Sequence, residues 1–132
     1  MSRFLRRLRS EDGSAVVETA LMLPIVLMLV FGFIAFTQAV ATKVVLETAA
    51  REGARSYAVS NSAATAQAKV REELAVGRIN PDAAQVVAQS TGGGRAVTVT
   101  MPYSFHVPFA GGYSPTLAGS AVFKQEPNPA FR

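Results

Sequence analysis

The sequence contains no cysteine, no tryptophan and a single histidine, His106. Without cysteine the chain has no disulfide bond, no thiolate metal ligand and no cysteine nucleophile. One histidine also excludes a cluster of histidine ligands and a histidine pair. Charged residues are scarce, at 17% of the chain against about 25% in typical soluble domains. These absences leave little from which to build a catalytic centre, so we expect no enzyme activity, no bound metal and no cofactor.

The sequence does contain a long apolar run, residues 20–36, in which 17 consecutive positions lack a polar side chain. Further apolar residues extend this run backward to Ala15, with Glu18 embedded, and forward to Ala41, past Thr37 and Gln38. The hydrocarbon core of a bilayer takes about 17–25 helical residues. The run is too long for the apolar part of a secretory signal, and too uniformly apolar for the core helix of a small domain. We therefore expect a membrane span over about residues 15–41.

The orientation of this span follows from the charges on its flanks. Four of the 13 basic residues lie just before it, and they are Arg3, Arg6, Arg7 and Arg9. Basic residues that flank a span stay on the cytoplasmic side. Residues 1–13 are thus predicted to be a cytoplasmic leader, with the C-terminal part across the membrane. Because a topology signal accounts for the clustered charge, nucleic acid is not an expected partner.

The segment Gly13-Ser14-Ala15-Val16-Val17-Glu18 connects the leader to the apolar run. A glycine leaves the backbone open to a protease. A carboxylate inside a membrane helix costs several kcal/mol unless it has a partner or lies near the headgroups. One interpretation of Glu18 is therefore a helix start at headgroup level. The other is that the pattern resembles the processing site of type IV pilin-like precursors.

In such precursors a membrane aspartyl peptidase cuts after Gly or Ala, and Glu is the fifth residue of the mature chain. The resemblance implies that a prepilin peptidase cleaves between Gly13 and Ser14. The new α-ammonium group of Ser14 would then compensate the carboxylate of Glu18 on a neighbouring subunit.

Two further motifs narrow the resemblance. Pro24 lies a few residues into the apolar run, and Ala-Ala-Arg-Glu-Gly-Ala-Arg follows the run at residues 49–55. Together with the segment from Gly13 to Glu18, they make the chain similar to the TadE-like family, the minor pilins or pseudopilins of tight-adherence (Flp) pili. The resemblance is strongest over residues 13–57. It is weaker at residues 117–123, which are similar to the family's closing strand. TadF-type proteins share the N-terminal pattern.

We predict an α+β fold of the type IV pilin-like kind, with one long helix over residues 14–60. Beyond the span, the helix is amphipathic, with apolar residues on one stripe and charged residues at four-residue steps on another. The predicted apolar stripe comprises Val40, Val44, Ala50, Ala54, Tyr57 and Ala58. An outer domain over residues 61–126 and a loose tail over residues 127–132 complete the chain.

The outer domain is expected to contain one short helix and a three-stranded antiparallel sheet. The helix covers residues 63–76, after an N-cap at residues 60–62 and before Gly77. Strands are predicted at residues 85–90, 96–105 and 117–125, with a glycine hairpin at residues 92–94 and a loop at 109–115. We expect the sheet to pack on the amphipathic half of the long helix.

Several residues are candidates for assembly. Pro24 removes a helical hydrogen bond and either kinks the helix or is simply tolerated. Gly53 indicates close backbone packing, on the following strands or on an adjacent subunit. Candidate assembly contacts are Glu18, Arg51, Gly53 and Arg55, although the two arginines also fit solvated helix charges. The aromatic residues Tyr103, Phe105, Phe109 and Tyr113 fit either a local core or a subunit contact.

The resemblance implies a structural protein needed to assemble a tight-adherence pilus, which supports adhesion or secretion. Its partners would be the prepilin peptidase, the major Flp pilin, other minor pilins, the inner-membrane assembly platform and membrane lipid. It would reside in the bacterial inner membrane with its N-terminus cytoplasmic and its C-terminal domain periplasmic. From there it would either enter the shaft or tip of the extracellular pilus or act only in an assembly complex. The alternative is an uncleaved single-span periplasmic scaffold or binding module of an envelope machine.

Overall fold

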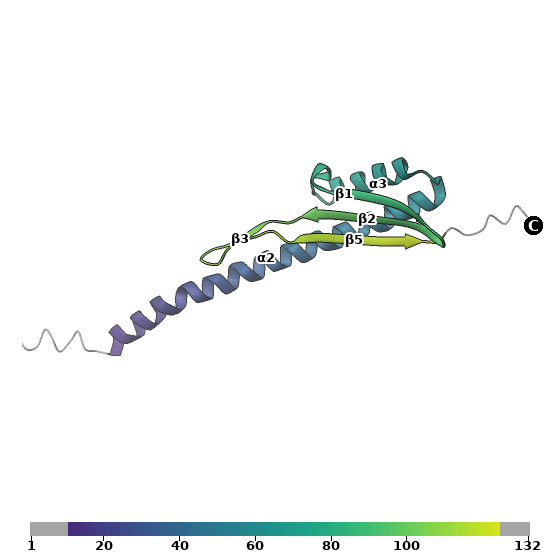
Figure 1. Cartoon of the computed structure of the whole chain (residues 1–132). Coiled ribbons are helices and arrows are strands. Elements are labelled where there is room, and N and C mark those ends of the chain that lie inside the picture. The colour runs from purple at the N-terminus through teal and green to yellow at the C-terminus, as the bar shows by residue number, and fades with distance from the viewer. Residues whose placement is uncertain (1–10, 125–132) are drawn as a thin grey trace, which may run out of the picture.

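The structure is a computed structural model that describes residues 11–124. The predicted basic cluster at residues 3–9 and the predicted tail at residues 127–132 lie outside the described residues. Figure 1 shows a long helix, α2, with a small sheet and a second helix, α3, gathered over its C-terminal part. The α+β class, the two helices and the antiparallel sheet agree with the prediction.

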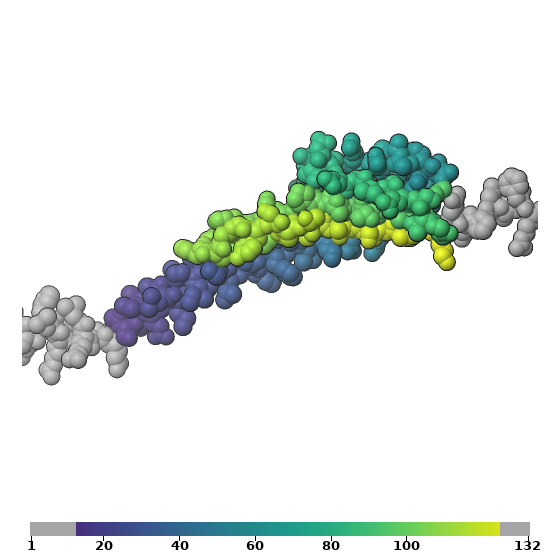
Figure 2. Space-filling view, in the orientation of Figure 1, coloured from purple at the N-terminus to yellow at the C-terminus, as the bar shows by residue number. Residues whose placement is uncertain are grey.

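Helix α2 runs without interruption from Glu11 to Ser60, which is 50 residues or about 75 Å at 1.5 Å per residue. It begins three residues before the predicted start at Ser14. That prediction placed the start at the expected cleavage site, and the uncleaved chain has no physical reason to begin its helix there. Figure 2 shows that the N-terminal part of α2 extends away from the rest of the fold. Large apolar side chains of this part, such as Leu21 and Phe33, are exposed.

Helix α3 spans Ala63–Val76, as predicted. Ser62 caps it, since its side chain accepts a hydrogen bond from the backbone N–H of Thr65 at 3.3 Å. Asn61 adopts a left-handed φ of 53° and turns the chain between the two helices. The predicted turn near Pro81 is the short 3₁₀ helix η1, Pro81–Ala83.

The main sheet has the strand order β1-β2-β5, and both pairs are antiparallel. Its strands are β1 (Gln85–Thr91), β2 (Gly94–Pro102) and β5 (Thr116–Phe123). Val97, Val99 and Met101 of β2 point into the core, which is the alternation that the sequence predicted. The glycine hairpin between β1 and β2 also lies where it was predicted.

The predicted strand over residues 96–105 is wrong at its end, and so is the predicted loop over residues 109–115. β2 stops at Pro102, which has no N–H to continue the ladder. The chain then forms a second, two-stranded sheet from β3 (Phe105–Val107) and β4 (Gly111–Tyr113). We call residues 103–115 the arm. A hydrogen bond of 2.9 Å from the Tyr103 N–H to the Pro115 carbonyl joins the arm to the main sheet.

The core lies between α2, α3 and the main sheet, and it consists of small and branched apolar side chains. Leu46, Val70, Leu74, Val97 and Val99 are its largest fully buried members. The predicted apolar stripe is wrong at its first two positions, because Val40 and Val44 are exposed. Ala50, Ala54 and Tyr57 of the predicted stripe are buried, as expected. One row of covered positions on α2 follows alternating steps of four and three, and from Leu46 onward the buried face widens beyond this row. The row comprises Met28, Gly32, Ala35, Ala39, Thr42, Leu46, Ala49 and Gly53.

Two glycines let other elements approach α2 closely. A Cβ at Gly119 of β5 would lie 2.6 Å from the carbonyl oxygen of Leu46, so β5 rests on the helix backbone. A Cβ at Gly53 would clash with Val70 of α3 and lie 3.4 Å from Cγ1 of Val97 in β2. The close packing predicted for Gly53 therefore occurs within this chain.

Candidate functional site

The candidate processing bond joins Gly13 and Ser14 in the first turns of α2, where both residues are exposed. A Cβ at Gly13 would meet nothing within 4 Å, so packing does not require glycine at this position. Glycine in a helix costs about 1 kcal/mol relative to alanine. This cost makes the turn easier to unwind, and a peptidase that binds extended chain must unwind it.

Glu18 lies on α2 one turn after Ser14, and both side chains are exposed. Residues four apart share one helix face, so the carboxylate of Glu18 and a new amino group at Ser14 would lie on the same side of the helix. The neighbouring Thr19 hydroxyl donates to the Ala15 carbonyl at 2.8 Å, which satisfies this polar group within the helix. The surface around Glu18 is open, so a positive charge on a second copy would have free access to its carboxylate.

Pro24 lies within α2, and the helix continues through it. Proline has no N–H to donate to the carbonyl four residues earlier, which is that of Ala20. In lipid, such a carbonyl needs another donor or a local adjustment of the helix. Pro24 therefore leaves the Ala20 carbonyl without its usual helical donor in the apolar part of α2.

The candidate assembly residues of the motif at 49–55 separate onto two faces of α2. Gly53 is buried against α3 and β2, whereas Arg51 and Arg55 are exposed. Arg51 lies 4.0 Å from Glu47 one turn earlier, between side chains that are 68% and 42% exposed. Exposed pairs of this kind contribute a few tenths of a kcal/mol. The two arginines are thus available to a partner, and Gly53 serves the fold.

Sequence reasoning missed Arg95, whose guanidinium lies 5.0 Å from the centre of the Tyr57 ring. The same group donates hydrogen bonds to Ser90 and to the side chain of Asn61. It joins the β1–β2 hairpin to the end of α2 and to the turn before α3. The sequence does show an arginine directly after three glycines at a predicted hairpin. It does not show what Arg95 contacts, because Tyr57 and Asn61 are distant in the chain.

The aromatic cluster of the arm forms a row of rings. The ring centres of Tyr103 and Phe105 are 6.1 Å apart, and those of Phe105 and Tyr113 are 5.7 Å apart. Phe109 does not join the row and is 78% exposed. His106 is exposed in the middle of β3. Within residues 11–124, no three His, Asp or Glu side chains are grouped to hold a metal ion.

Among residues 11–124, one helix, over residues 13–60, is long and apolar enough to cross a membrane by length and composition, and only 6% of its most apolar stretch is buried. Residues 13–55 match the family model of TadE-like proteins. The N-terminal segment is TadE-like. This match confirms the resemblance inferred from Gly13, Glu18, Pro24 and the motif at residues 49–55. A search of curated proteins and a search of solved structures each found no match.

The TadE-like segment begins at Gly13 and ends on the packed part of α2. It thus includes the apolar helix and the residues that receive the outer domain. Helix α3 and both sheets lie outside the match, as does the strand at residues 117–123. TadE-like proteins are structural proteins associated with tight-adherence pili. The match accordingly points to an association with tight-adherence pili.

Proposed function

We propose that the chain is a minor pilin or pseudopilin that helps to assemble a tight-adherence pilus of the Flp, type IVb-like class. The observation that carries this proposal is the TadE-like match, which includes Gly13, Ser14 and Glu18 at the exposed start of an uninterrupted helix. In this role the chain supports adhesion or secretion through the pilus. It is a substrate of the prepilin peptidase and performs no catalysis itself.

In the proposed topology, the apolar part of α2 crosses the bacterial inner membrane. Residues 1–13 are the cytoplasmic leader, and residues 61–126 form the periplasmic domain. The exposed apolar side chains around α2, such as Leu21, Ile25 and Phe33, are covered by lipid before assembly. Afterwards they are covered by the helices of the major pilin and of other minor pilins, because the same surface suits either environment.

Assembly proceeds in two steps. Cleavage after Gly13 removes the basic leader and creates an α-ammonium group on Ser14. The carboxylate of Glu18 then pairs with this group on the neighbouring subunit, which offsets the cost of a charge in an apolar environment. The weak hydrogen bonding around Pro24 allows the helix to adjust as the assembly platform extracts it from the membrane.

The cleavage step is tested by the intact mass of the membrane-bound protein, expressed with its processing peptidase. We expect the mass of residues 14–132 for the wild type and for Gly13→Ala, since the peptidases accept either small residue. Gly13→Val should retain the leader, because a branched side chain obstructs the approach to the scissile bond. A wild-type protein that keeps Met1–Gly13 would contradict the pilin role and favour the uncleaved scaffold.

The charge-pairing step is tested with Glu18→Gln, which removes the charge and keeps the shape. We expect normal membrane insertion but loss of most of its incorporation into purified pili. Glu47→Gln is the matched control, since Glu47 is an exposed carboxylate on the same helix outside the predicted span. Equal incorporation of Glu18→Gln and the wild type would refute the pairing of Glu18 with Ser14.

A further inference from the structure

The arm and the predicted membrane span occupy the same stretch of α2. Gly119 of β5 rests on the helix at Leu46, and the arm runs from there toward the N-terminal end of α2 (Figure 1). From Gly119 back to Gly111 the extended chain covers about 26 Å, which equals about 17 residues of helix. The tip of the arm therefore lies level with Met28, the midpoint of the predicted span over residues 15–41.

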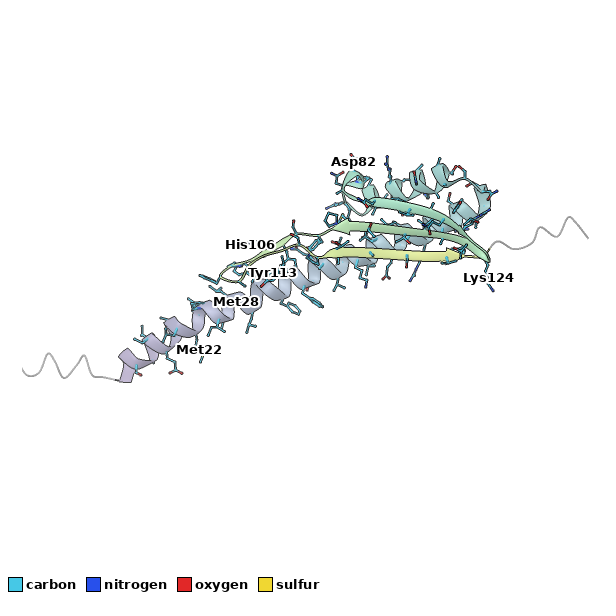
Figure 3. The ribbon with its side chains drawn as sticks, in the orientation of Figure 1. Met22, Met28, Asp82, His106, Tyr113 and Lys124 are labelled. Carbon is cyan, nitrogen blue, oxygen red and sulfur yellow. The ribbon has the colours of Figure 1, made fainter. Side chains whose placement is uncertain are left out.

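The arm packs on one narrow face of this stretch. Figure 3 shows Met28 of α2 at the level of Tyr113 of the arm. β3 contacts α2, and Val107 of the arm and Ala35 of the helix are both buried. The other faces of the helix stay open, as for Phe33, which is 71% exposed. In the structure, this narrow face is therefore covered by the arm of the same chain.

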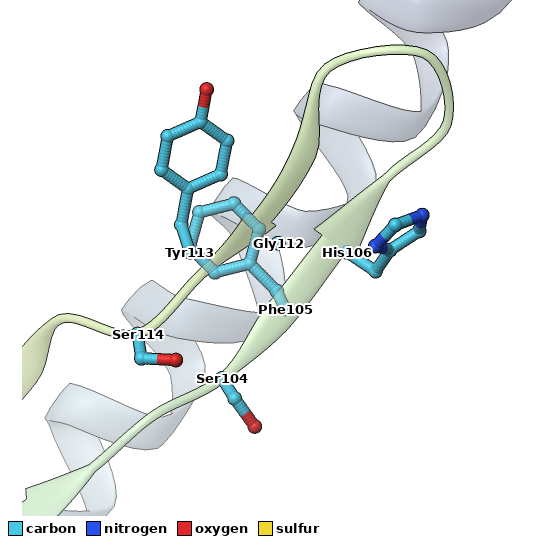
Figure 4. A pocket seen from close by; sticks show the side chains of 6 residues that line it. All are labelled: Ser104, Phe105, His106, Gly112, Tyr113 and Ser114. Atoms are coloured by element: carbon cyan, nitrogen blue, oxygen red, sulfur yellow. The ribbon is translucent and has the colours of Figure 1, made fainter.

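The arm in this position is incompatible with surrounding lipid. β3 and β4 form a sheet of their own, so each strand has one edge that is not paired with another strand. Open sheet edges do not occur in hydrocarbon, because lipid offers no partner to their N–H and C=O groups. Ser104, His106 and Ser114 also expose polar side chains on the arm (Figure 4). Lipid and the packed arm thus exclude each other on α2.

A bilayer nevertheless needs part of the helix that the arm covers. Residues 15–28 supply about 20 Å of helix, whereas the hydrocarbon core is about 30 Å thick. An extension in the other direction would bring the carboxylates of Glu11 and Asp12 into hydrocarbon, which is costly. About 10 Å of the span must therefore come from helix beyond Met28.

The connection between the arm and the main sheet is suited to bending. The ladder of the main sheet stops at Pro102, and the ladder of the arm starts at Phe105. Pro102 and Pro115 flank this gap and have no N–H with which to continue a ladder. Within the arm, the rings of Phe105 and Tyr113 stack with centres 5.7 Å apart (Figure 4). The arm can thus move as one unit about the gap.

We propose that the arm is a movable strap, which stands away from α2 while the helix beyond Met28 lies in the bilayer and closes on it when this stretch leaves the lipid. The closed form is the one in Figure 1. Because α2 can return to lipid only after the arm reopens, closing favours movement of the helix out of the membrane. The opening rests on the proposed membrane insertion of α2, and the closing rests on its proposed extraction.

The test measures the distance from the tip of the arm to α2 in bilayers of two thicknesses. Leu29→Cys and Phe109→Cys place spin labels at exposed positions, and the chain has no other cysteine. The full chain is reconstituted into phosphatidylcholine vesicles with a hydrocarbon core of about 20 Å or about 30 Å. Val59→Cys with Val122→Cys, both exposed on the outer domain, is the control pair. Double electron–electron resonance measures both distances.

We expect a short distance between the tip and the helix in the thin bilayer and a distance longer by about 10 Å or more in the thick one. The control distance should be the same in both. A short distance in both bilayers would overturn the strap and end the span near Met28. A long distance in both would overturn the closing of the arm on α2. Release of the protein from both kinds of vesicle at alkaline pH would overturn the membrane insertion, and the strap with it.

Val107→Ala tests the contact that holds the arm closed. Val107 is the buried residue among residues 103–115, so we expect the variant to show the long distance even in the thin bilayer. His106→Ala, at an exposed position of the same strand, is the matched control and should keep the short distance. A short distance in Val107→Ala would overturn the assignment of Val107 as the closing contact.

Discussion

The two parts of α2 belong to one continuous helix and yet have opposite surroundings. In residues 11–41, large apolar side chains are exposed around the helix, as for Leu29 at 68%. In residues 42–60, one face is covered by α3 and the sheet, and Leu46 is completely buried. The first part is apolar on every side, whereas the second has one apolar face and a charged face with Glu47, Arg51 and Arg55.

This difference shows which part of α2 contributes to the folding free energy of the outer domain. A helix that is apolar all round offers no distinct face to its own chain, and it needs lipid or other helices. A helix with one face of small residues lets a sheet and a second helix approach its backbone, as Gly53 and Gly119 demonstrate. The second part of α2 is therefore the main structural member of the outer domain, and the first part contributes only the narrow face that is covered around Ala35.

The sharpest test of this comparison replaces a leucine in each part by alanine. We expect Leu46→Ala to lower the free energy of unfolding of the outer domain by about 2–5 kcal/mol, because it leaves a cavity in the core. Leu29→Ala should change it by no more than about 0.5 kcal/mol. Denaturant unfolding of the full chain in detergent, followed by circular dichroism, measures both. Equal losses would contradict the division of α2 into two parts.

The reverse test introduces a charge into each part. Ile25→Arg should disfavour membrane insertion by about 2.5–3.5 kcal/mol, the cost of arginine at the centre of a span. Val44→Arg should leave insertion unchanged, because Val44 is an exposed residue beyond the predicted span. The measured quantity is the fraction of protein that resists extraction from membranes at alkaline pH. If Val44→Arg impaired insertion as strongly, the span would extend farther along the helix than predicted.

Arg95 tests how the outer domain is held to the second part of α2. Arg95→Met removes the contact with the Tyr57 ring and the hydrogen bonds to Asn61 and Ser90. We expect a loss of about 1–3 kcal/mol in unfolding free energy, from one cation–π contact and two hydrogen bonds. Arg71→Met, at an exposed position of α3, serves as the control and should have little effect. An Arg95→Met variant as stable as the wild type would show that these contacts of Arg95 do not stabilise the outer domain.

The smallest expected effect concerns the exposed surface of α3. Hydrogen bonds to Glu72 and then to Glu73, at 3.0 and 3.2 Å, raise the pKa of Lys69. Because this pKa is raised in the folded protein, the ion pairs of Lys69 stabilise the fold while Lys69 is charged. This stabilisation is lost as the pH rises through that pKa. The melting temperature of the wild type should therefore exceed that of Lys69→Met slightly at neutral pH. The difference should disappear in strongly alkaline solution, and a difference that persisted there would contradict the ion-pair origin.

Local sequence patterns predicted much of the fold because they act over a few residues. The cap at Ser62, the alternation of Val97, Val99 and Met101 and the glycine hairpin each depend on neighbours in the chain. The N-terminal site was predicted in the same way, from the spacing of Gly13 and Glu18, and the TadE-like match covers it. The cleavage and charge pairing assigned to these residues stay predictions.

The amino-acid sequence by itself determined the long helix, its apolar first part, the short helix and the three main strands, since periodicity and capping suffice for these. The sequence pattern also placed Ala50, Ala54 and Tyr57 on the covered face of α2, but only the tertiary structure decided which face is covered before them, where the prediction was wrong for Val40 and Val44. It also decided the arm and the contacts of Arg95. These features depend on residues far apart in sequence, such as Asn61 and Arg95 at a separation of 34. Their packing is settled by the close approach of whole elements, which no local pattern encodes.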